Sequence, residues 1–395
     1  MHDYSGHPFQ AQLSRALSGR DHDVTHSWCE AHVSGRGNLH AEPGESLTFE
    51  SIAPGERIDK LSFVSRLVKE LRYGVQLGRQ TRRVGPDIVL VSNVPIPMLV
   101  VFVAFALLTR TSWVLWQQDV QGVAVRSFAG RQLSRVFQVV ALVIAAGERW
   151  AARRADAIVV IAEAFAEVHE EWGTGDKVEV IPNWAPLDEI VPRPRTNAWA
   201  VEHDLLETAN LVYSGTLGLK HDPRLLVGLA RKVIDAGQPV HLTVVSEGPA
   251  MDVLREEAAR LAVPATLLPF QPYDRLPDVL GTGDVLVVLL EQDAGAFSVP
   301  SKTLSYLCAG RPVIGLMPSE NLAARLVAQA EGCVLPPREG ALDEAADWVA
   351  DVLRDAERAA LLGKRARELA EDEFALDVCT DRFEGVLAGA ARESR

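Results

Sequence analysis

Short apolar runs rich in β-branched residues alternate with longer periodic stretches along nearly the whole chain. The apolar runs predict buried strands at 87–92, 112–117, 157–161, 177–181, 210–214, 241–245, 265–268, 284–290 and 312–316. The periodic stretches predict helices at 11–26, 60–84, 340–372 and 376–392, and the polar, glycine-containing stretch 32–55 predicts a loop. Strands that alternate with helices indicate parallel βαβ units and an α/β fold.

The pattern is interrupted once, by a stretch in which no regular element fits. Residues 182–200 contain Pro182, Pro186, Pro192 and Pro194. Such proline density marks a connector. The sequence therefore predicts two Rossmann-like domains, 1–185 and 186–375, followed by a helical segment at 376–395. Because ligands of open α/β sheets bind at the carboxyl ends of the strands, we expect parallel sheets that face a central cleft holding the site.

The start of the chain departs from this pattern. A doubly wound domain normally opens with an apolar strand, whereas here only Met1 and His2 precede the loop-like Asp3-Tyr-Ser-Gly6. We expect the chain to begin downstream of that strand, so that the first sheet lacks a strand near its middle. The alternative is that the first strand lies elsewhere in the chain.

Composition and charge narrow the class of protein. The 395 residues carry 40 basic and 53 acidic side chains, a net charge of −13, which argues against a dedicated nucleic-acid binder. The four cysteines lie far apart without a Cys-x-x-Cys pair, which predicts neither a zinc site nor a disulfide framework. The amino terminus has no signal-peptide pattern. These features favour a cytoplasmic protein.

Two apolar stretches raise the question of a membrane. The first, 88–108, is interrupted by polar residues and prolines, and its uninterrupted part is shorter than a spanning helix, so we interpret it as a strand and a buried helix. The second, 136–146, is flanked on both sides by arginines. It is either a core-facing helix or a surface helix that contacts anionic lipid headgroups, with 126–154 as a peripheral contact at the inner face of the plasma membrane.

The most informative motif is Ser298-Val-Pro-Ser-Lys-Thr-Leu-Ser-Tyr-Leu-Cys-Ala-Gly-Arg-Pro-Val313. A proline in the first turn and a glycine at the exit delimit a helix. The free N–H groups of Ser301, Lys302 and Thr303, together with the Lys302 ammonium, would form an anion site suited to a diphosphate. The alternative is an ordinary βαβ connection with a solvated lysine.

A second motif, Tyr213-Ser-Gly-Thr-Leu-Gly-Leu-Lys220, also follows a predicted strand. Gly215 allows close approach of the backbone to a ligand, and Lys220 would add positive charge. The spacing is neither a dinucleotide fingerprint nor a P-loop, so this motif alone is a weak signal. Two lysines that each follow a strand of the same half indicate an anion site more strongly than one lysine does.

Several motifs occur in the order found in one family. They are Ile181-Pro-Asn-Trp184, Tyr213-Ser-Gly-Thr-Leu-Gly218, Val245-Ser-Glu-Gly-Pro249, Leu268-Pro-Phe-Gln-Pro272 and the block from Val299-Pro-Ser-Lys302 to Ala309-Gly-Arg-Pro312. Together they resemble the retaining glycosyltransferases of family 4, in particular the branch that builds colanic acid and other exopolysaccharides of the cell envelope. The first half is a looser match, through His2-Asp-Tyr-Ser-Gly-His-Pro8 and Trp116-Gln-Gln-Asp119.

The resemblance implies a fold and roles for named residues. The fold is GT-B, with the acceptor in the first domain, the nucleotide-sugar donor in the second, and segment 376–395 crossing back onto the first domain. The residues implied at the donor diphosphate are Gly6, Gly215, Thr216, Lys220, Ser301, Lys302 and Thr303. Those implied near the nucleoside are Phe270, Gln271, Tyr273 and Ser305. Asp119, with His7 and Trp116, would lie on the acceptor side, and Asp119, Lys220 and Lys302 would be catalytic.

One departure from the family pattern concerns the ribose. Many members carry two glutamates eight residues apart before the Cys-Ala-Gly-like turn, and here Phe297 and Ser305 occupy those positions. Recognition of the ribose would then fall to Ser305. The arginine usual in the first phosphate loop is replaced by Thr216, which leaves more of the charge neutralisation to Lys220 and Lys302.

The sequence thus predicts a metal-independent, retaining hexosyltransferase. It would use a nucleoside diphosphate sugar as co-substrate, without a cofactor, and transfer the sugar to a growing glycan or a lipid-linked glycan. The alternative is a catalytically silent relative that binds a nucleotide sugar or a partner protein. An epimerase of similar shape would need an acid and a base in the cleft, and none is evident.

Overall fold

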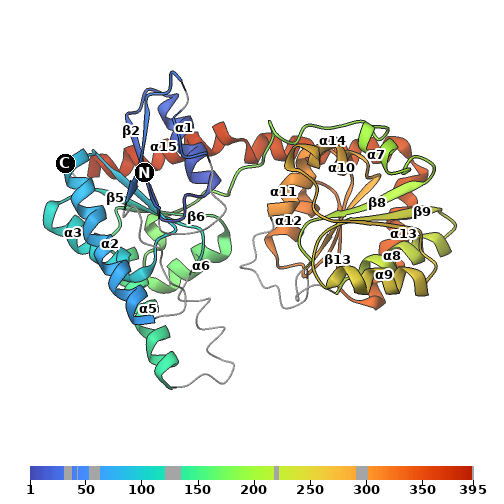
Figure 1. Cartoon of the computed structure of the whole chain (residues 1–395), viewed down its shortest axis with the longest axis horizontal. Helices are drawn as coiled ribbons and strands as arrows, with labels where there is room; N and C mark the ends of the chain where they lie inside the picture. Colours follow the sequence, from blue (N-terminus) through green and yellow to red (C-terminus); the bar gives the residue numbers. More distant parts are fainter. Residues whose placement is uncertain are drawn as a thin grey trace. The chain divides into compact units, whose positions relative to one another are not determined.

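The computed structural model describes residues 1–30, 38–41, 43–52, 63–120, 135–217, 222–290 and 301–393 (Figure 1). The chain divides into two compact units. The first contains 1–183 and 376–395, and the second contains 184–375. The change of unit between Asn183 and Trp184 falls in the proline-rich connector.

The first unit is built on a parallel sheet. Among the described residues it has seven strands in the order β3-β2-β1-β4-β5-β6-β7. The strands are β1 (His2–Asp3), β2 (Val24–Cys29), β3 (Leu47–Ile52), β4 (Val89–Ser92), β5 (Trp113–Gln117), β6 (Ala157–Val160) and β7 (Val178–Val180). The helices of this unit are α1 (Pro8–Ser18), α2 (Phe63–Val84), α3 (Ile96–Thr109), α5 (Arg135–Ala152), α6 (Glu163–Trp172) and α15 (Leu376–Glu393).

The second unit repeats the plan. Its six described strands are parallel in the order β10-β9-β8-β11-β12-β13. They are β8 (Ala209–Ser214), β9 (Val240–Val245), β10 (Ala265–Leu268), β11 (Val285–Leu289), β12 (Val313–Leu316) and β13 (Cys333–Leu335). Its helices are α7 (Ala198–Glu202), α8 (Arg224–Asp235), α9 (Ala250–Arg260), α10 (Leu276–Gly281), α11 (Ser301–Cys308), α12 (Leu322–Gln329), α13 (Leu342–Arg354) and α14 (Ala356–Phe374). The prediction of two Rossmann-like halves with parallel sheets is confirmed.

The middle of the first sheet corrects one prediction. We expected a strand to be missing there, but β1 pairs in parallel with β2 on one side and with β4 on the other. The strand is only two residues long, His2 and Asp3, which is too short for a hydrophobic pattern to reveal. Thr25 O accepts a hydrogen bond of 2.9 Å from the Met1 amino group.

Two further predictions in the first unit were wrong. The helix expected at 11–26 ends at Ser18, and Val24–Cys29 forms β2, because Gly19 closes the helix and the following residues are β-branched and aromatic. The loop expected at 32–55 contains the edge strand β3, Leu47–Ile52, whose solvent-facing side explains its polar sequence.

In the second unit, the single helix expected at 340–372 is divided into two at Asp355. The Asp355 side chain accepts from the backbone N–H of Arg358 at 3.0 Å and caps α14.

The apolar stretch 88–108 forms β4 and α3, as predicted. Val103 and Phe102 of α3 are fully buried. Within the described ranges, no helix combines the length and the apolarity needed to cross a bilayer.

Helix α15 packs on the sheet and on α1 of the first unit (Figure 1). The ring of Phe383 meets that of Trp116 on β5 edge to face, with centroids 4.7 Å apart. Arg20, beyond α1, donates to the carboxylates of Asp381 and Glu384, each at 2.5 Å. Buried aromatic contact and surface ion pairs together hold the last helix on this unit.

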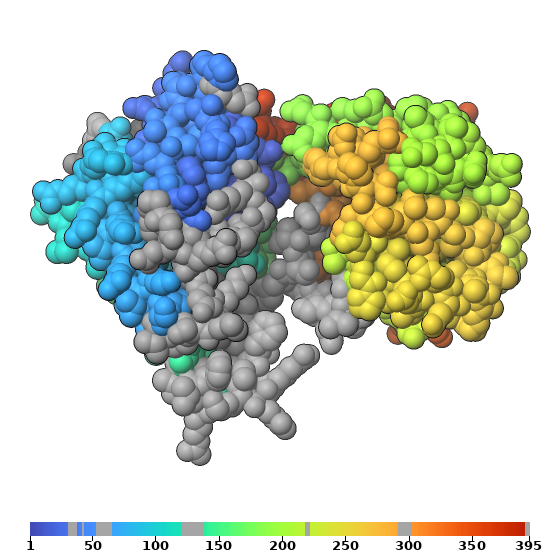
Figure 2. Space-filling view, viewed as in Figure 1, coloured from blue at the N-terminus to red at the C-terminus, as the bar shows by residue number. Residues whose placement is uncertain are grey.

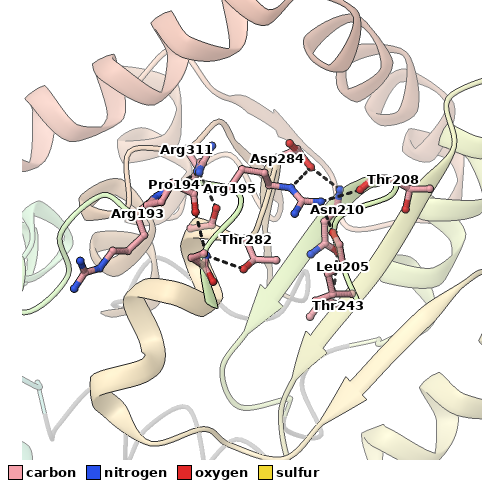
Figure 3. A network of polar contacts seen from close by, with 12 residues as sticks. Arg193, Pro194, Arg195, Leu205, Thr208, Asn210, Thr243, Thr282, Asp284 and Arg311 are labelled. Carbon is pink, nitrogen blue, oxygen red and sulfur yellow. Dashed lines mark hydrogen bonds and ion pairs between the residues drawn. The ribbon is translucent and has the colours of Figure 1, made fainter. Parts of the chain in front are cut away.

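A polar network fixes the connector to the second unit (Figure 3). Arg195 Nε donates to Asp284 Oδ2 at 2.9 Å, and the same oxygen accepts from the backbone N–H of Asn210 at 2.7 Å. Arg311 donates to the carbonyls of Arg193 and Gly281 at 2.9 and 2.7 Å. These contacts lie at the amino ends of β8, β11 and β12, the edge of the sheet opposite to the candidate site.

Candidate functional site

The candidate site of the second unit lies where its middle strand, β8, ends. Gly215 follows the strand with a φ of +144°, a conformation that side chains rarely adopt. Its backbone N–H donates to Val245 O at 3.0 Å, which holds the turn against β9. A Cβ at this position would lie 3.2 Å from Lys302 Nζ, so the absence of a side chain leaves room for the lysine.

Lys302 reaches this turn from the first turn of α11. Its Nζ donates to Tyr213 Oη and lies over the Tyr213 ring, 4.4 Å from the centroid. Tyr213 Oη donates in turn to Thr216 O at 2.9 Å. Among the described residues, no carboxylate pairs with Lys302. Burial lowers the pKa of the lysine to about 8.

An ammonium group held in this way is prepared to bind an anion. Its partners are a ring and a hydroxyl, so its charge is only partly compensated, and the desolvation that lowers its pKa would be relieved by a bound phosphate. The backbone N–H groups at the start of α11, from Ser301, Lys302 and Thr303, carry the positive end of the helix dipole.

The scaffold around Lys302 is formed by residues that the sequence analysis did not single out. Tyr306, one helical turn after Lys302, accepts from Ser214 N at 2.7 Å and donates to Ser214 O at 3.1 Å. Ser246 Oγ accepts from Leu217 N at 3.2 Å. The i, i+4 spacing of Lys302 and Tyr306 places both on one face of α11. This spacing is the sequence feature that could have identified Tyr306 as a neighbour of the lysine.

The remaining residues proposed for the diphosphate fall into two groups. Thr216 is exposed, whereas Thr303 is fully buried and its Oγ1 has no hydrogen-bond partner in the described part of the chain. Lys220, also proposed for the diphosphate, lies outside the described residues, as does Phe297, which occupies a glutamate position of the family pattern.

The residues proposed for the nucleoside are spread over two elements. Phe270 and Tyr273 follow β10 and are 46% and 58% exposed, so both rings are accessible. The Gln271 side chain accepts from Trp199 Nε1 at 3.3 Å and donates to Pro269 O at 3.0 Å. Ser305 is half-buried on α11.

In the first unit, Gly6 and His7 lie between β1 and α1. Gly6 is buried with a φ of +69°, and His7 is the N-cap residue of α1. The His7 ring stacks on Phe9, and burial lowers its pKa. Asp119 is exposed just after β5. All three lie at the carboxyl ends of strands of the first sheet.

Trp116, proposed for the acceptor side, is buried in this structure. The side chain is 1% exposed and packs on Phe383, so it belongs to the core. Trp184, for which stacking on a sugar or lipid was left open, is buried as well. Trp113 is buried as predicted. Aromatic residues within buried strands are core residues even where a motif is nearby.

A family model matches the first half of the chain, and solved structures match nearly all of it. Residues 7–184 match the model of the glycosyl transferase 4-like domain. No curated protein matches the chain by sequence. HepE of Anabaena, solved in complex with UDP, is 14% identical with a TM-score of 0.69, and the similarity covers 98% of each chain.

The chain has the GT-B fold.

Two other solved GT-B structures show the same likeness. Sucrose-phosphate synthase from Thermosynechococcus elongatus is 16% identical, with a TM-score of 0.66 over 98% of this chain and 96% of that one. WaaG, a glycosyltransferase involved in lipopolysaccharide biosynthesis, is 13% identical, with a TM-score of 0.62 over 98% of this chain and 99% of its own. The expectation of a GT-B fold, with its two Rossmann-like halves, is therefore confirmed. Within the described ranges, no group of three His, Cys, Asp or Glu side chains is placed to hold a metal ion.

Proposed function

We propose that this GT-B protein transfers a sugar from a nucleoside diphosphate sugar to a glycan or lipid-linked glycan acceptor. The observation that carries the proposal is the desolvated and only partly compensated ammonium of Lys302 at the first turn of α11, beside Gly215. The match of residues 7–184 to a glycosyl transferase 4-like domain and the UDP complex of HepE support it.

In the proposed reaction, the bond between the sugar and the diphosphate breaks and negative charge accumulates on the leaving diphosphate. Lys302 and the N–H groups at the start of α11 stabilise that charge, because they are already oriented and partly desolvated. Lys220 supplies a second positive charge. Metal-independent transfer with retention of configuration, as in the family that the motifs resemble, is part of the proposal. Asp119 orients an acceptor or sugar hydroxyl, and no general base is assigned.

The test is a panel of nucleoside diphosphates and their sugars. We expect a diphosphate to raise the thermal-unfolding midpoint, since a ligand of the folded state stabilises it, and the matching donor to be hydrolysed slowly even without acceptor. Product configuration, read by NMR, reports retention. Binding without any turnover would instead favour the silent relative, and absence of binding across the panel would contradict both.

Two likenesses indicate the class of acceptor. The motifs resemble the colanic acid and exopolysaccharide branch, and WaaG acts in lipopolysaccharide biosynthesis. From these two likenesses we infer that the acceptor is a glycan carried by a lipid. We therefore include in the proposal a cytoplasmic protein in peripheral contact with the inner face of the plasma membrane.

The described part of 126–154 supports that contact. In α5, Leu142 and Val143 are 64% and 66% exposed. Helices α2, α3 and α5 form one layer, because Gly74 of α2 lies against Val101 of α3 and Gly147 of α5 lies against Ile96 of α3.

Helix α2, light blue on the surface in Figure 2, adds charge to this layer. Its exposed residues include both basic and apolar side chains, namely Arg66, Val68, Leu71, Arg72, Val75, Arg79, Arg82 and Arg83. Exposed apolar side chains mixed with arginines are typical of surfaces that lie on anionic lipid.

Replacing Leu142 and Val143 with serine is expected to reduce sedimentation with vesicles that contain anionic phosphatidylglycerol. The apolar area available for insertion falls, while the fold is unaffected because both side chains are exposed. Val201→Ser, at a 56% exposed position of the second unit, is the control and should sediment as the wild type does. A wild-type protein that stays in the supernatant with anionic vesicles at low salt would contradict the membrane contact.

A further inference from the structure

Asp3 is a fully buried carboxylate at the end of β1, an interior strand of the first sheet. Its backbone is paired with Trp28 of β2 and Ser92 of β4, so the residue is fixed on both sides. No ion pair neutralises it among the described residues. A buried charge without a counterion is costly unless hydrogen bonds replace its hydration.

Hydrogen bonds from two loops supply that replacement. Oδ1 accepts from the backbone N–H of Ser5 at 3.2 Å, from Ser5 Oγ at 3.1 Å and from Asn93 Nδ2 at 3.2 Å. Oδ2 accepts from the backbone N–H of His7. Asn93 follows β4 and adopts a φ of +55°, so the same carboxylate ties the loop after β1 to the loop after β4.

These bonds determine the shape of the loop around Gly6. The N–H groups on both sides of it, from Ser5 and His7, turn inward to Asp3, and Gly6 itself has a φ of +69°. Gly6 is buried, and within the described ranges its N–H donates to no acceptor. An orphaned buried N–H group is rare, and here it lies beyond the carboxyl end of β1, at the edge where α/β sheets bind ligands.

We propose that Asp3 is a positioning residue whose ionised carboxylate holds the Tyr4–His7 loop in the conformation that presents the Gly6 N–H, at the carboxyl edge of the first sheet, to a sugar or phosphate oxygen of a ligand bound there. This inference rests on the proposed transferase function. Asp3 acts through the loop and does not itself contact the donor. The family resemblance implies only that Gly6 approaches the donor. The inference adds that the Asp3 carboxylate determines the conformation of the loop and makes that conformation depend on protonation.

Two groups at the start of the first sheet titrate near pH 6, the Asp3 carboxyl and the Met1 amino group, whose pKa burial lowers to about 6. Only a titration that D3N abolishes belongs to Asp3. Burial raises the pKa of Asp3 to about 6, against the effect of its four donors. His7 on the same loop has a pKa lowered by burial, which favours its neutral form. Tyr73 from α2 is the titratable group that faces Asp3 from the neighbouring helix, and its pKa is raised well above 10, so it is neutral too. Asn93, from the loop after β4, does not titrate.

Protonation would weaken the loop, because a neutral carboxyl gains a donor and loses part of its acceptor capacity among four donors. Asp3→Asn imposes that state at every pH without changing the volume of the side chain. We expect kcat to fall by about 100-fold, the scale of losing one oriented donor to a developing charge, with little change in the affinity for the nucleoside diphosphate alone. The acid limb of the wild-type kcat profile, with a midpoint near pH 6, should be absent in D3N.

A spectroscopic measurement separates this inference from the proposed function. With ¹⁵N-glycine labelling, the Gly6 amide signal of the wild type should titrate with a midpoint near pH 6, and that of D3N should not. Ser5→Ala, which removes only the hydroxyl donor, is the matched control and should keep the titration. A pH-independent Gly6 signal in the wild type, or full kcat in D3N, would overturn the role of Asp3. A normal titration in a protein without turnover would leave the loop device standing and refute the transferase instead.

Discussion

Replacement of Lys302 by methionine lowers kcat for sugar transfer by about 10²–10³-fold, the loss expected when one preorganised positive group at a developing charge is removed. Methionine keeps the length and the apolar stem of the side chain and removes only the ammonium, so the effect reports charge. The Nζ group contacts Tyr213 and approaches Gly215, and no carboxylate in the described residues shares its charge. Lys364→Met is the matched control, since this lysine is exposed on α14 and should leave kcat unchanged.

The same substitution separates a functional from a structural lysine. A desolvated ammonium whose pKa has fallen from 10.5 to about 8 destabilises the folded chain below pH 8, on the order of 3 kcal/mol for that shift. Between pH 8 and about 10.4 the unfolded chain binds the proton and the folded chain does not, so the contribution to stability rises with pH in this window. K302M should therefore be at least as stable as the wild type at pH 7, and should lack that rise.

A K302M protein that has lost both activity and several kcal/mol of stability at pH 7 would contradict this account. The lysine would then act as a structural partner of Tyr213 and not as a site prepared for an anion. Wild-type kcat in K302M would also contradict it.

Replacement of Trp116 by alanine lowers the free energy of unfolding of the first unit by about 3–5 kcal/mol, the range for deleting a large buried aromatic side chain. Trp116 is 1% exposed and Phe383 is fully buried against it, so the cavity opens between β5 and α15. Phe383→Ala should cost a similar amount. The double variant should cost less than the sum, because the edge-to-face contact of about 0.5–1.5 kcal/mol is lost only once.

The measurement is hydrogen exchange of amides in β5 and α15 at increasing urea concentrations, which reports the opening of this unit separately from the other. Leu108→Ala is the control, since that side chain is 87% exposed and should change the free energy by less than about 0.5 kcal/mol. If these amides are as well protected from exchange in W116A as in the wild type, the contact with Trp116 does not hold α15. The hypothesis that Trp116 stacks on a ligand would then be favoured again.

Five of the six described strands of the second unit were predicted, most clearly β11 and β12, which are continuous apolar runs buried on both faces of a parallel sheet. The edge strand β13, Cys333–Leu335, was missed because three residues are too few to show a pattern. The misses in the first unit have physical reasons. A two-residue strand such as β1 has no period to detect, and an edge strand such as β3 carries polar residues on its open side. The fold class was predicted from the alternation of strands and helices along the chain, and these local errors leave that alternation intact.

The candidate site was predictable in part. Lys302 follows from its place in the first turn of a helix that leaves a strand, a pattern local to the sequence. Its contact with Tyr213 joins residues 89 positions apart, and no spacing rule reports such a contact. For Trp116 the resemblance of a motif implied a place at the acceptor, whereas its position in β5 buries the side chain. Asp3 was missed because nothing in a short loop shows that one carboxylate gathers four donors.

The most direct test of the central claim is the reactivity of Lys302 toward acetic anhydride, measured by mass spectrometry as a function of pH with and without nucleoside diphosphates. The account predicts a reactivity midpoint near pH 8, and a shift to higher pH with slower labelling when a diphosphate binds, because the anion stabilises the ammonium form. Exposed Lys364 should label at the same rate with or without the diphosphate. A Lys302 that titrates near 10.5 and labels equally with every diphosphate would contradict the claim that its ammonium is held to receive the leaving group.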